Sequence, residues 1–589
     1  MFGNERKAVS MKVSDYIARF LKENGCGCVF GYPGGAVTHL IDSLYRTDGI
    51  TFIGTYHEQA AAFAAEGYAR MKNGFGAALA TSGPGAVNLL TGVGSAYFDS
   101  VPVLYLTGQV NTYEYKGKRN IRQLGFQETD IVSMAKPVTK YAARVTDPEK
   151  IRFELEKALF TACSGRKGPV LLDLPMDVQR AEVNEKKLPG FQAEASRGSD
   201  FSVRETIRLL NESRRPVFLA GGGVRLAGAS EPLGRTAEKL GIPVVCSLMG
   251  RDSFDSRSQF YMGMIGTYGN RCANFTAANS DLVVALGSRL DTRQTGTVPE
   301  SFARGARLVR VEIDSSELRH KIKPDEIAVR ADVGAFLEKL SGASDRVRAD
   351  WNEWRKTVLD YRQRYPLDPG CGWGNPNSIM NAVSRMVPEG CAAALDVGQN
   401  QMWGAQSFRV TGGRRLLTSG GMGAMGFSLP CAVGAHYAGS EKAFAFTGDG
   451  GLQMNLQELE LLKRNGIPVK VIVFNNRCLG MIRQFQEMYF EGRCNATVRD
   501  YEAPCFSKIA EAYGIGSLRV ETREDFLKLD RFLSQPGPGL AEIILPRDTS
   551  VVPKLGVGKP IEDQEPPLGR KEFRSNMIVE PYGEINNEL

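Results

Sequence analysis

Two stretches, AFAFTGDGG (443–451) and VKVIVFNN (469–476), decide the fold and the chemistry of this 589-residue chain. Each begins as an apolar run typical of a buried strand in a parallel sheet, and each ends in polar residues. Adjacent parallel strands end at the same edge of a sheet, where open α/β folds bind ligands. We therefore expect Gly448-Asp449-Gly450 and Asn475-Asn476 to lie together at such an edge.

The residues at this edge suit a metal ion and a diphosphate. Oxygen atoms of Asp449 and Asn476 are ligands for a hard cation such as Mg²⁺, and the carbonyl of Cys478 would complete the protein ligands. Gly450 and Gly451 let backbone N–H groups approach phosphate oxygens. Taken alone, Asp-Gly and Asn-Asn are also common turn sequences, so the motif needs support from the rest of the chain.

The alternation of apolar strands, turns and helices continues along the whole chain. It predicts an α/β protein with three doubly wound parallel-sheet domains and a C-terminal tail, in which the first and third domains look like variants of one plan. Polar or Pro/Gly-rich stretches mark the boundaries. The expected parts are an N-terminal domain over 10–182, a central domain over 200–345, a C-terminal domain over 370–548 and a tail over 549–589.

The composition limits the class of protein. The net charge of +7 comes from 73 Lys and Arg against 66 Asp and Glu, without a basic tract dense enough to suggest nucleic-acid binding. No stretch approaches the roughly 20 apolar residues of a membrane span, and residues 1–11 lack a signal-peptide core. Cys26 and Cys28 lack the second ligand pair of a zinc site. We expect a cytoplasmic protein with reduced, buried thiols.

Further segments surround the two stretches in a fixed order: FGYPGG (30–35), HEQ (57–59), EGYAR (66–70), TSGPG (81–85), FQE (126–128), GPVLLDLP (168–175), DVGQ (396–399), QMW (401–403) and TSGGMGAMGF (418–427). With these segments the chain resembles the thiamine-diphosphate-dependent enzymes over about residues 12–548, and most closely the acetolactate synthase family. The resemblance implies a pyrimidine-binding first domain, a central FAD-type domain and a diphosphate-binding third domain.

The resemblance also implies catalytic roles. Glu58 matches the glutamate that hydrogen-bonds the pyrimidine ring of the cofactor and favours the tautomer that deprotonates thiazolium C2. The surrounding alanines predict the buried, dry helix that this role needs. Met425 matches the residue on which the cofactor folds into a V shape. Phe126 and Gln127 match residues near the donor 2-keto acid, and the planar fork of Arg293 suits an acceptor carboxylate.

The remaining implied residues contact cofactors. In the family the glutamate and the diphosphate site come from opposite subunits, so we expect a homodimer or homotetramer, with a small regulatory subunit as a possible partner. FAD would be structural, since decarboxylation and ligation need no electron transfer. The implied thiamine diphosphate contacts are Pro33, Gly34, Thr81, Gly85, Val397, Gly398, Gln399, Gly423, Met425, Gly448, Gly450, Gly451, Gly480 and Met481, and the implied FAD contacts are Gly221, Gly222, Gly223, Gly287, Arg289, Asp291, Arg293, Glu312, Ile313 and Asp332.

The chain departs from the family on the acceptor side. Phe485 replaces a tryptophan that favours 2-ketobutyrate, Thr267-Tyr268 replaces Met-His, Asn400 replaces histidine and Thr292 replaces aspartate. The 111–125 loop is unusually long and carries Lys116, Lys118, Arg119 and Arg122. It is either a solvated surface loop or a site for the phosphates of a bulky acceptor. The end of the tail, 556–589, either docks over the active site or a neighbouring subunit, or is disordered.

We therefore expect a thiamine-diphosphate-dependent transferase that decarboxylates pyruvate and passes the two-carbon unit to a carbonyl acceptor. With pyruvate as acceptor the product is 2-acetolactate, a reaction of branched-chain amino acid biosynthesis. One alternative acceptor is a nucleotide-linked keto sugar. A non-catalytic paralogue that acts as an assembly subunit is the alternative from another class, and intact Glu58, Asp449 and Asn476 argue against it.

Overall fold

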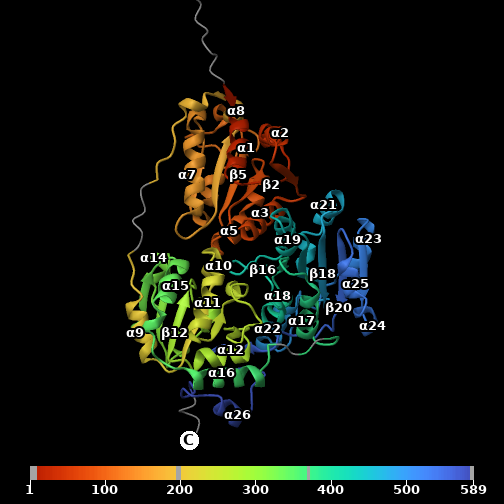
Figure 1. Cartoon of the computed structure of the whole chain (residues 1–589). Helices are drawn as coiled ribbons and strands as arrows, with labels where there is room; N and C mark the ends of the chain where they lie inside the picture. The colour runs from red at the N-terminus through yellow and green to blue at the C-terminus, as the bar shows by residue number, and fades with distance from the viewer. Residues whose placement is uncertain (1–9, 194–199, 368–369, 371, 584–589) are drawn as a thin grey trace, which may run out of the picture.

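The computed structural model describes residues 10–193, 200–367, 370 and 372–583. These residues contain three parallel sheets of six strands each, flanked by helices, in three domains arranged around a common junction (Figure 1). The three doubly wound domains expected from the sequence are confirmed. No helix in the described part of the chain is long and apolar enough to cross a membrane.

The N-terminal sheet has the strand order β3-β2-β4-β5-β7-β6. Strands β2, β4, β5 and β7 are buried along their whole length, as expected for apolar runs covered by helices on both faces. The strands are β2 (Cys28–Gly31), β3 (Thr51–Gly54), β4 (Gly76–Ala80), β5 (Val103–Gln109), β6 (Tyr141–Arg144) and β7 (Val170–Pro175), and the main helices are α1 (Val13–Glu23), α2 (Thr38–Arg46), α3 (Glu58–Lys72), α5 (Leu90–Phe98) and α7 (Ile151–Cys163).

The C-terminal sheet repeats this plan with the order β16-β15-β17-β18-β20-β19. In both sheets the strands lie in the sequence second, first, third, fourth, sixth, fifth, which confirms that the two domains are variants of one design. The strands are β15 (Ala392–Leu395), β16 (Arg415–Thr418), β17 (Ala443–Gly448), β18 (Val469–Asn475), β19 (Gly516–Val520) and β20 (Gly539–Ile544), and the helices nearest the site are α18 (Gln399–Ser407), α19 (Ser428–Tyr437), α20 (Asp449–Met454), α21 (Glu458–Asn465) and α22 (Gly480–Tyr489).

The central sheet is different. Its order, β11-β10-β9-β12-β13-β14, runs third, second, first, fourth, fifth, sixth, which is the order of dinucleotide-binding folds. Helix α16 (Asn352–Arg364), beyond the expected domain end at residue 345, packs on this domain through buried Trp354 and Tyr361. The strands are β9 (Pro216–Ala220), β10 (Val244–Cys246), β11 (Tyr261–Met264), β12 (Leu282–Leu286), β13 (Arg307–Glu312) and β14 (Ile327–Arg330).

Helices α3 and α19 join the N-terminal and C-terminal domains by close backbone contact. A Cβ atom on Gly67 would lie 2.2 Å from the Cys431 carbonyl oxygen, and one on Gly434 would lie 1.8 Å from that of Ala64. Only glycine fits at these two positions. The alanine-rich sequence of α3 therefore serves a helix crossing between domains, and it brings the start of α3 close to the loops of the third sheet.

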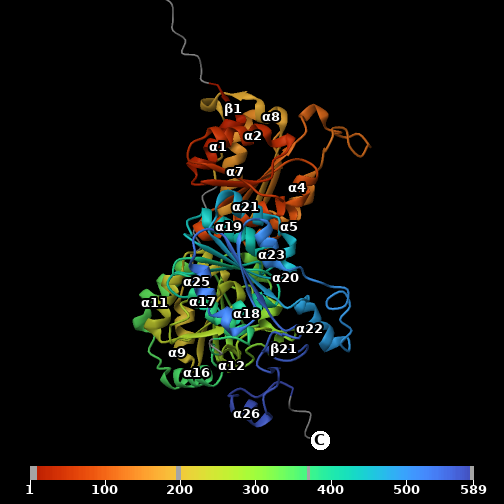
Figure 2. The same ribbon diagram turned by 90° about the vertical axis from the view of Figure 1, so that its right-hand side faces the viewer.

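The tail docks on the central domain of its own chain. Leu555, in strand β21 (Lys554–Leu555), donates its backbone N–H to the Thr267 carbonyl at 2.7 Å. Further along, Ile561 and Phe573 are buried in the central core, and Asn279 Nδ2 donates to the Asn576 carbonyl at 2.8 Å. Figure 2 shows the tail passing from β21 to α26 (Arg570–Ser575) below the central domain. Its described part is thus ordered by apolar burial and hydrogen bonds.

Candidate active site

The edge of the C-terminal sheet brings Asp449 and Asn476 together, because β17 and β18 are paired neighbours that end side by side. Asp449 begins α20 and is 3% exposed. Its Oδ1 accepts from the Gly450 N–H at 2.8 Å and its Oδ2 from the Cys478 N–H at 3.1 Å. Asn476 Nδ2 donates to Gln399 Oε1 at 2.8 Å, which orients its Oδ1 as a possible ligand. Burial raises the pKa of Asp449 to about 6, and a bound cation would oppose this effect.

Glycines allow the segments at this edge to approach one another closely. A Cβ atom on Gly480 would lie 2.0 Å from Gln399 Oε1, and one on Gly450 would lie 3.3 Å from the methyl carbon of Met425. Gly398 and Gly423 adopt φ angles of 147° and 69°, which suit glycine. Met425 therefore lies close to the Gly448–Gly451 turn. Val397, Gly448, Gly451 and Met481 lie in the same loops and helix starts.

Asp396 is a residue of this site that the sequence reasoning quoted only as part of a motif. Its Oδ1 accepts from the N–H groups of Val397 and Gly426 at 2.9 Å, and its Oδ2 accepts from the Ser428 N–H at 3.0 Å and hydroxyl at 2.9 Å. Burial raises the pKa of Asp396 to about 6. The carboxylate ties the loop after β15 to the residues that follow Met425. An acidic residue directly after an apolar strand was the available signal.

A second cluster lies at the carboxyl edge of the N-terminal sheet. Glu58 begins α3 and is 7% exposed, and Asn88 Nδ2, which the sequence reasoning missed, donates to its Oε2 at 3.0 Å. A Cβ atom on Gly85 would lie 3.0 Å from Glu58 Oε1, so the backbone of the 81–85 turn packs against the carboxyl group. His57 caps the helix by accepting the Gln59 N–H at 3.0 Å, a structural role.

The other N-terminal residues with implied roles lie around the same turns. A Cβ atom on Gly34 would lie 2.5 Å from that of Thr81, and Gln127, with a φ angle of 66°, packs on Gly83. Pro33 lies next to Gly34 in the exposed turn after β2. Phe126 is 85% exposed in the single chain. The structure thus gathers the residues with implied cofactor contacts into two half-sites, one at the edge of each related sheet.

Glu458 of the C-terminal domain hydrogen-bonds to the turn that precedes Glu58. The sequence did not predict this contact. Its side chain is fully buried, and its Oε1 accepts from the Tyr56 N–H at 2.9 Å. From the other end of α21, Arg464 donates to the Tyr56 hydroxyl at 3.0 Å. Burial raises the pKa of Glu458 to about 8. The position of Glu58 therefore depends on the C-terminal domain.

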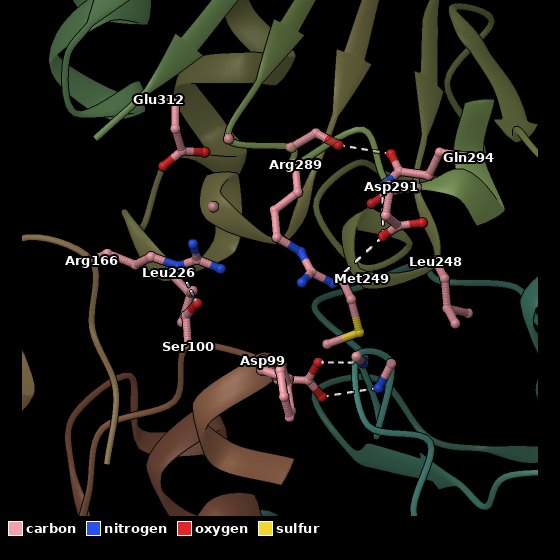
Figure 3. Close-up of a pocket in the computed structure, with 18 of the residues that line it drawn as sticks. Asp99, Ser100, Arg166, Leu226, Leu248, Met249, Arg289, Asp291, Gln294 and Glu312 are labelled. Carbon is pink, nitrogen blue, oxygen red and sulfur yellow. Dashed lines mark hydrogen bonds and ion pairs between the residues drawn. The ribbon is translucent and has the colours of Figure 1, made fainter. Parts of the chain in front are cut away.

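The central domain contains a cavity of about 470 Å³ at the carboxyl ends of its strands (Figure 3). It lies where the strand order reverses between β9 and β12, the usual place for a dinucleotide in this topology. Gly221 packs under the cavity, since its Cβ would lie 2.1 Å from the Gly287 carbonyl oxygen. The other residues with implied FAD contacts line it: Gly222, Gly223, Gly287, Arg289, Asp291, Arg293, Glu312, Ile313 and Asp332.

The N-terminal and C-terminal domains close this cavity. Asp99, Ser100 and Arg166 come from the first domain, and Gly420 and Gly421 come from the third. Figure 3 shows the Arg166 and Arg289 guanidinium groups on opposite sides of the space, with Met249 between the domains. The cavity combines apolar walls, cations and close backbone, which fits a flavin nucleotide.

The residues on the acceptor side also lie near one another. Tyr268 and Arg293 line the cavity, with the guanidinium 5.9 Å from the Tyr268 ring centre. The Phe485 ring lies 4.8 Å from that of Tyr489, whose hydroxyl accepts the Val557 N–H at 3.1 Å. In Figure 2, α22 and β21 lie side by side here. The tail thus contacts the region around Tyr268 and Phe485, where the sequence analysis places departures from the family.

The basic 111–125 loop is folded mainly on itself. Glu128 accepts the N–H groups of Lys116 at 2.9 Å and Leu124 at 2.8 Å, and Lys116 Nζ donates to the Arg122 carbonyl at 3.2 Å. Lys118, Arg119 and Arg122 are exposed. Both alternatives for this loop, a solvated surface and a phosphate site, remain predictions.

Two related sheets that each carry one candidate half-site at an edge, together with a third domain of dinucleotide topology, are the arrangement expected of the thiamine-diphosphate-dependent enzymes. Three family models agree: the N-terminal TPP-binding domain of thiamine pyrophosphate enzymes matches residues 11–134, the central domain 203–340 and the C-terminal TPP-binding domain 396–543. The chain belongs to this family, in the group of acetolactate synthase large subunits.

Relatives across most of the chain support this placement. The acetolactate synthase large subunit of Lactococcus lactis is 37% identical over 92% of this chain and 94% of its own length. A probable acetolactate synthase large subunit of Methanocaldococcus jannaschii is 36% identical over 91% and 92%. The chloroplastic acetolactate synthase of Arabidopsis thaliana is 36% identical over 94% and 84%.

Proposed function

We propose that the chain is an acetolactate synthase, a transferase that uses thiamine diphosphate, Mg²⁺ and FAD to convert two pyruvate molecules into 2-acetolactate and CO₂. The observation that carries the proposal is the placement of buried Asp449 and Asn476 at the neighbouring ends of two paired strands, with Met425 packed close to Gly450. The names of the relatives supply the reaction.

The third sheet would hold the charged end of the cofactor. Asp449, Asn476 and the Cys478 carbonyl would bind Mg²⁺, and the N–H groups of Gly450 and Gly451 would face the phosphates. Met425 would support the folded cofactor. Thiamine diphosphate supplies the electron sink for decarboxylation. The protein contributes orientation and a site from which water is excluded.

The first sheet would hold the pyrimidine end. Glu58, positioned by Asn88, would exchange a proton with the ring nitrogen of the cofactor. We infer that this half-site faces the third domain of a partner subunit in a homodimer or homotetramer. Exposed apolar side chains near both half-sites support such an interface, including Phe126 and Tyr32 on one and Met422 and Met454 on the other.

The acceptor would bind between the cavity and the tail. Arg293 would hold its carboxylate, while Phe126 and Gln127 would contact the donor pyruvate. FAD in the central cavity would be structural. We place the protein in the cytoplasm, and the relatives' title of large subunit leaves room for a small regulatory subunit.

The test is incubation of the protein with ¹³C-labelled pyruvate, thiamine diphosphate, Mg²⁺ and FAD, followed by mass analysis of the product. We expect labelled acetolactate and CO₂. Glu58→Gln should lower CO₂ release by about 100-fold or more, the usual contribution of a general acid–base group. Exposed Glu149→Gln is the matched control and should not change the rate. Decarboxylation at the native rate by the Glu58 variant would refute the role of Glu58. A branched sugar formed in a second incubation, to which a nucleotide-linked keto sugar is added, would favour the keto-sugar alternative.

A further inference from the structure

The loop from Ser419 to Met425 belongs to two sites at once. It connects β16 to α19 and carries Gly423 and Met425, which belong to the diphosphate half-site. Its first glycines, Gly420 and Gly421, line the central cavity. A group that holds this loop therefore acts on both sites.

Asp99, a residue of the N-terminal domain, binds this loop through its side chain. It follows α5 of the N-terminal domain, and its side chain is 1% exposed. Its Oδ2 accepts from the Gly420 N–H at 2.9 Å and its Oδ1 from the Gly421 N–H at 2.8 Å. Figure 3 shows the carboxylate at the floor of the cavity, bonded to both nitrogens below Met249.

The surroundings leave the loop little freedom at this point. A Cβ atom on Gly420 would lie 2.2 Å from the Met249 sulfur, and one on Gly421 would lie 2.6 Å from the Cβ of Phe98. The Ser95 and Ser419 hydroxyls lie 3.1 Å apart, which adds a second tie from α5. The glycines that allow this seating are flexible by themselves, so the carboxylate and these neighbouring side chains together hold the loop in place.

We propose that Asp99 is a positioning residue that fixes the Ser419–Met425 loop, and that through this contact a flavin bound in the central cavity tightens the binding of thiamine diphosphate. The inference rests on the proposed cofactors. A flavin packed on Met249, Gly420 and Gly421 would restrain the loop end that Asp99 holds. Thiamine diphosphate would then bind to a loop that is already ordered, at a lower entropic cost.

The test measures dissociation constants in the full-length apoprotein. Thiamine diphosphate with Mg²⁺ is titrated by calorimetry with and without saturating FAD, and FAD is titrated with and without thiamine diphosphate. We expect each cofactor to tighten the other about tenfold in the wild type, because coupling of binding is reciprocal. In Asp99→Ala this factor should fall to about one, and in Asp99→Asn, which keeps one acceptor oxygen, to about threefold.

Asp252→Asn is the matched control. Asp252 is another buried carboxylate at the same junction, paired with Arg415 at 2.7 Å, and it has no hydrogen bond to the 420–425 residues among the described contacts. It should lower the melting temperature and leave the coupling factor unchanged. Hydrogen exchange of the 418–427 peptide gives a second readout, since the Gly420 and Gly421 amides should exchange faster in the Asp99 variants only.

An unchanged coupling factor in Asp99→Ala, together with unchanged exchange, would overturn the proposal. If Asp99→Ala fails to fold, the same comparison with Asp99→Asn decides it. Wild-type protein that binds thiamine diphosphate but no FAD would refute the flavin assignment and the coupling with it. The positioning role of Asp99 would then be decided by two results for the Asp99 variants, the hydrogen exchange of the loop and the affinity for thiamine diphosphate alone.

Discussion

The outer sheets and the central sheet use similar strands in different orders, and this difference matches the different ligands that we propose for them. The N-terminal and C-terminal sheets share one strand order, and each presents one half-site at its edge. The central sheet has the dinucleotide order, and its cavity lies where that order reverses. In our proposal the two related sheets thus bind opposite ends of thiamine diphosphate, and the central sheet binds FAD.

The largest expected effect would separate these two binding functions. Asp449→Ala should weaken binding of thiamine diphosphate with Mg²⁺ by more than about 100-fold, since even changes that only support a metal ligand cost 10–100-fold. FAD affinity should fall only by the loss of coupling. Calorimetric titration of each cofactor checks this, with Glu312→Gln, in the wall of the cavity, as the converse variant. Equal loss of both cofactors in Asp449→Ala would mean that the two sites are not separate.

A smaller effect would test the contact between the two related domains. The pKa of Glu458 is raised by burial from 4.5 to about 8, so the folded protein keeps a proton that the unfolded chain releases above about pH 4.5. The unfolded state then binds fewer protons, and the stability contributed by this group falls as pH rises toward 8. Glu458→Gln should remove this fall. As the pH rises from 5 to 9, the free energy of unfolding of the variant should therefore increase by about 2–4 kcal/mol relative to that of the wild type.

Urea unfolding of both proteins at pH 5, 7 and 9 measures the difference. Half-buried Glu460→Gln of the same helix serves as the control for changing a carboxylate in α21, and we expect it to change the free energy of unfolding far less than Glu458→Gln. A pH-independent difference between wild type and Glu458→Gln would show that the Glu458 carboxyl is not held in its neutral form.

The smallest expected effect concerns the basic loop of the N-terminal domain. Replacing Lys116, Lys118, Arg119 and Arg122 by glutamine should leave acetolactate formation from pyruvate within about twofold, because exposed charges of a loop that bonds to itself contribute little. Steady-state kinetics with pyruvate check this. A rise of the KM for a nucleotide-linked keto sugar in the same variant, with pyruvate decarboxylation intact, would instead support the alternative acceptor.

The metal-binding part of the candidate site was predictable because its residues follow strands. Asp449 and Asn476 occur directly after apolar runs, so a parallel sheet must place them at one edge, whereas the proposed flavin contacts came from the family resemblance. Asp99, Asn88 and Glu458 follow no such rule. Each acts on a segment from another part of the fold, and Asp99 and Glu458 act on another domain, which periodicity along the chain does not report.

The amino-acid sequence by itself determined the three α/β domains, the likeness of the first and third, and the sheet edge at which Asp449 and Asn476 lie, because local hydrophobic patterns and strand ends encode them. The other residues proposed for the two half-sites follow from the family resemblance. Only the tertiary structure decided which residues connect the domains. The Asp99 contact, the Glu458 contact and the docking of the tail depend on which surfaces meet. The physical reason is that a buried carboxylate or a close glycine contact is stable only when its partner, hundreds of residues away in the chain, packs against it. The role of such a residue is therefore visible only in the packed domains.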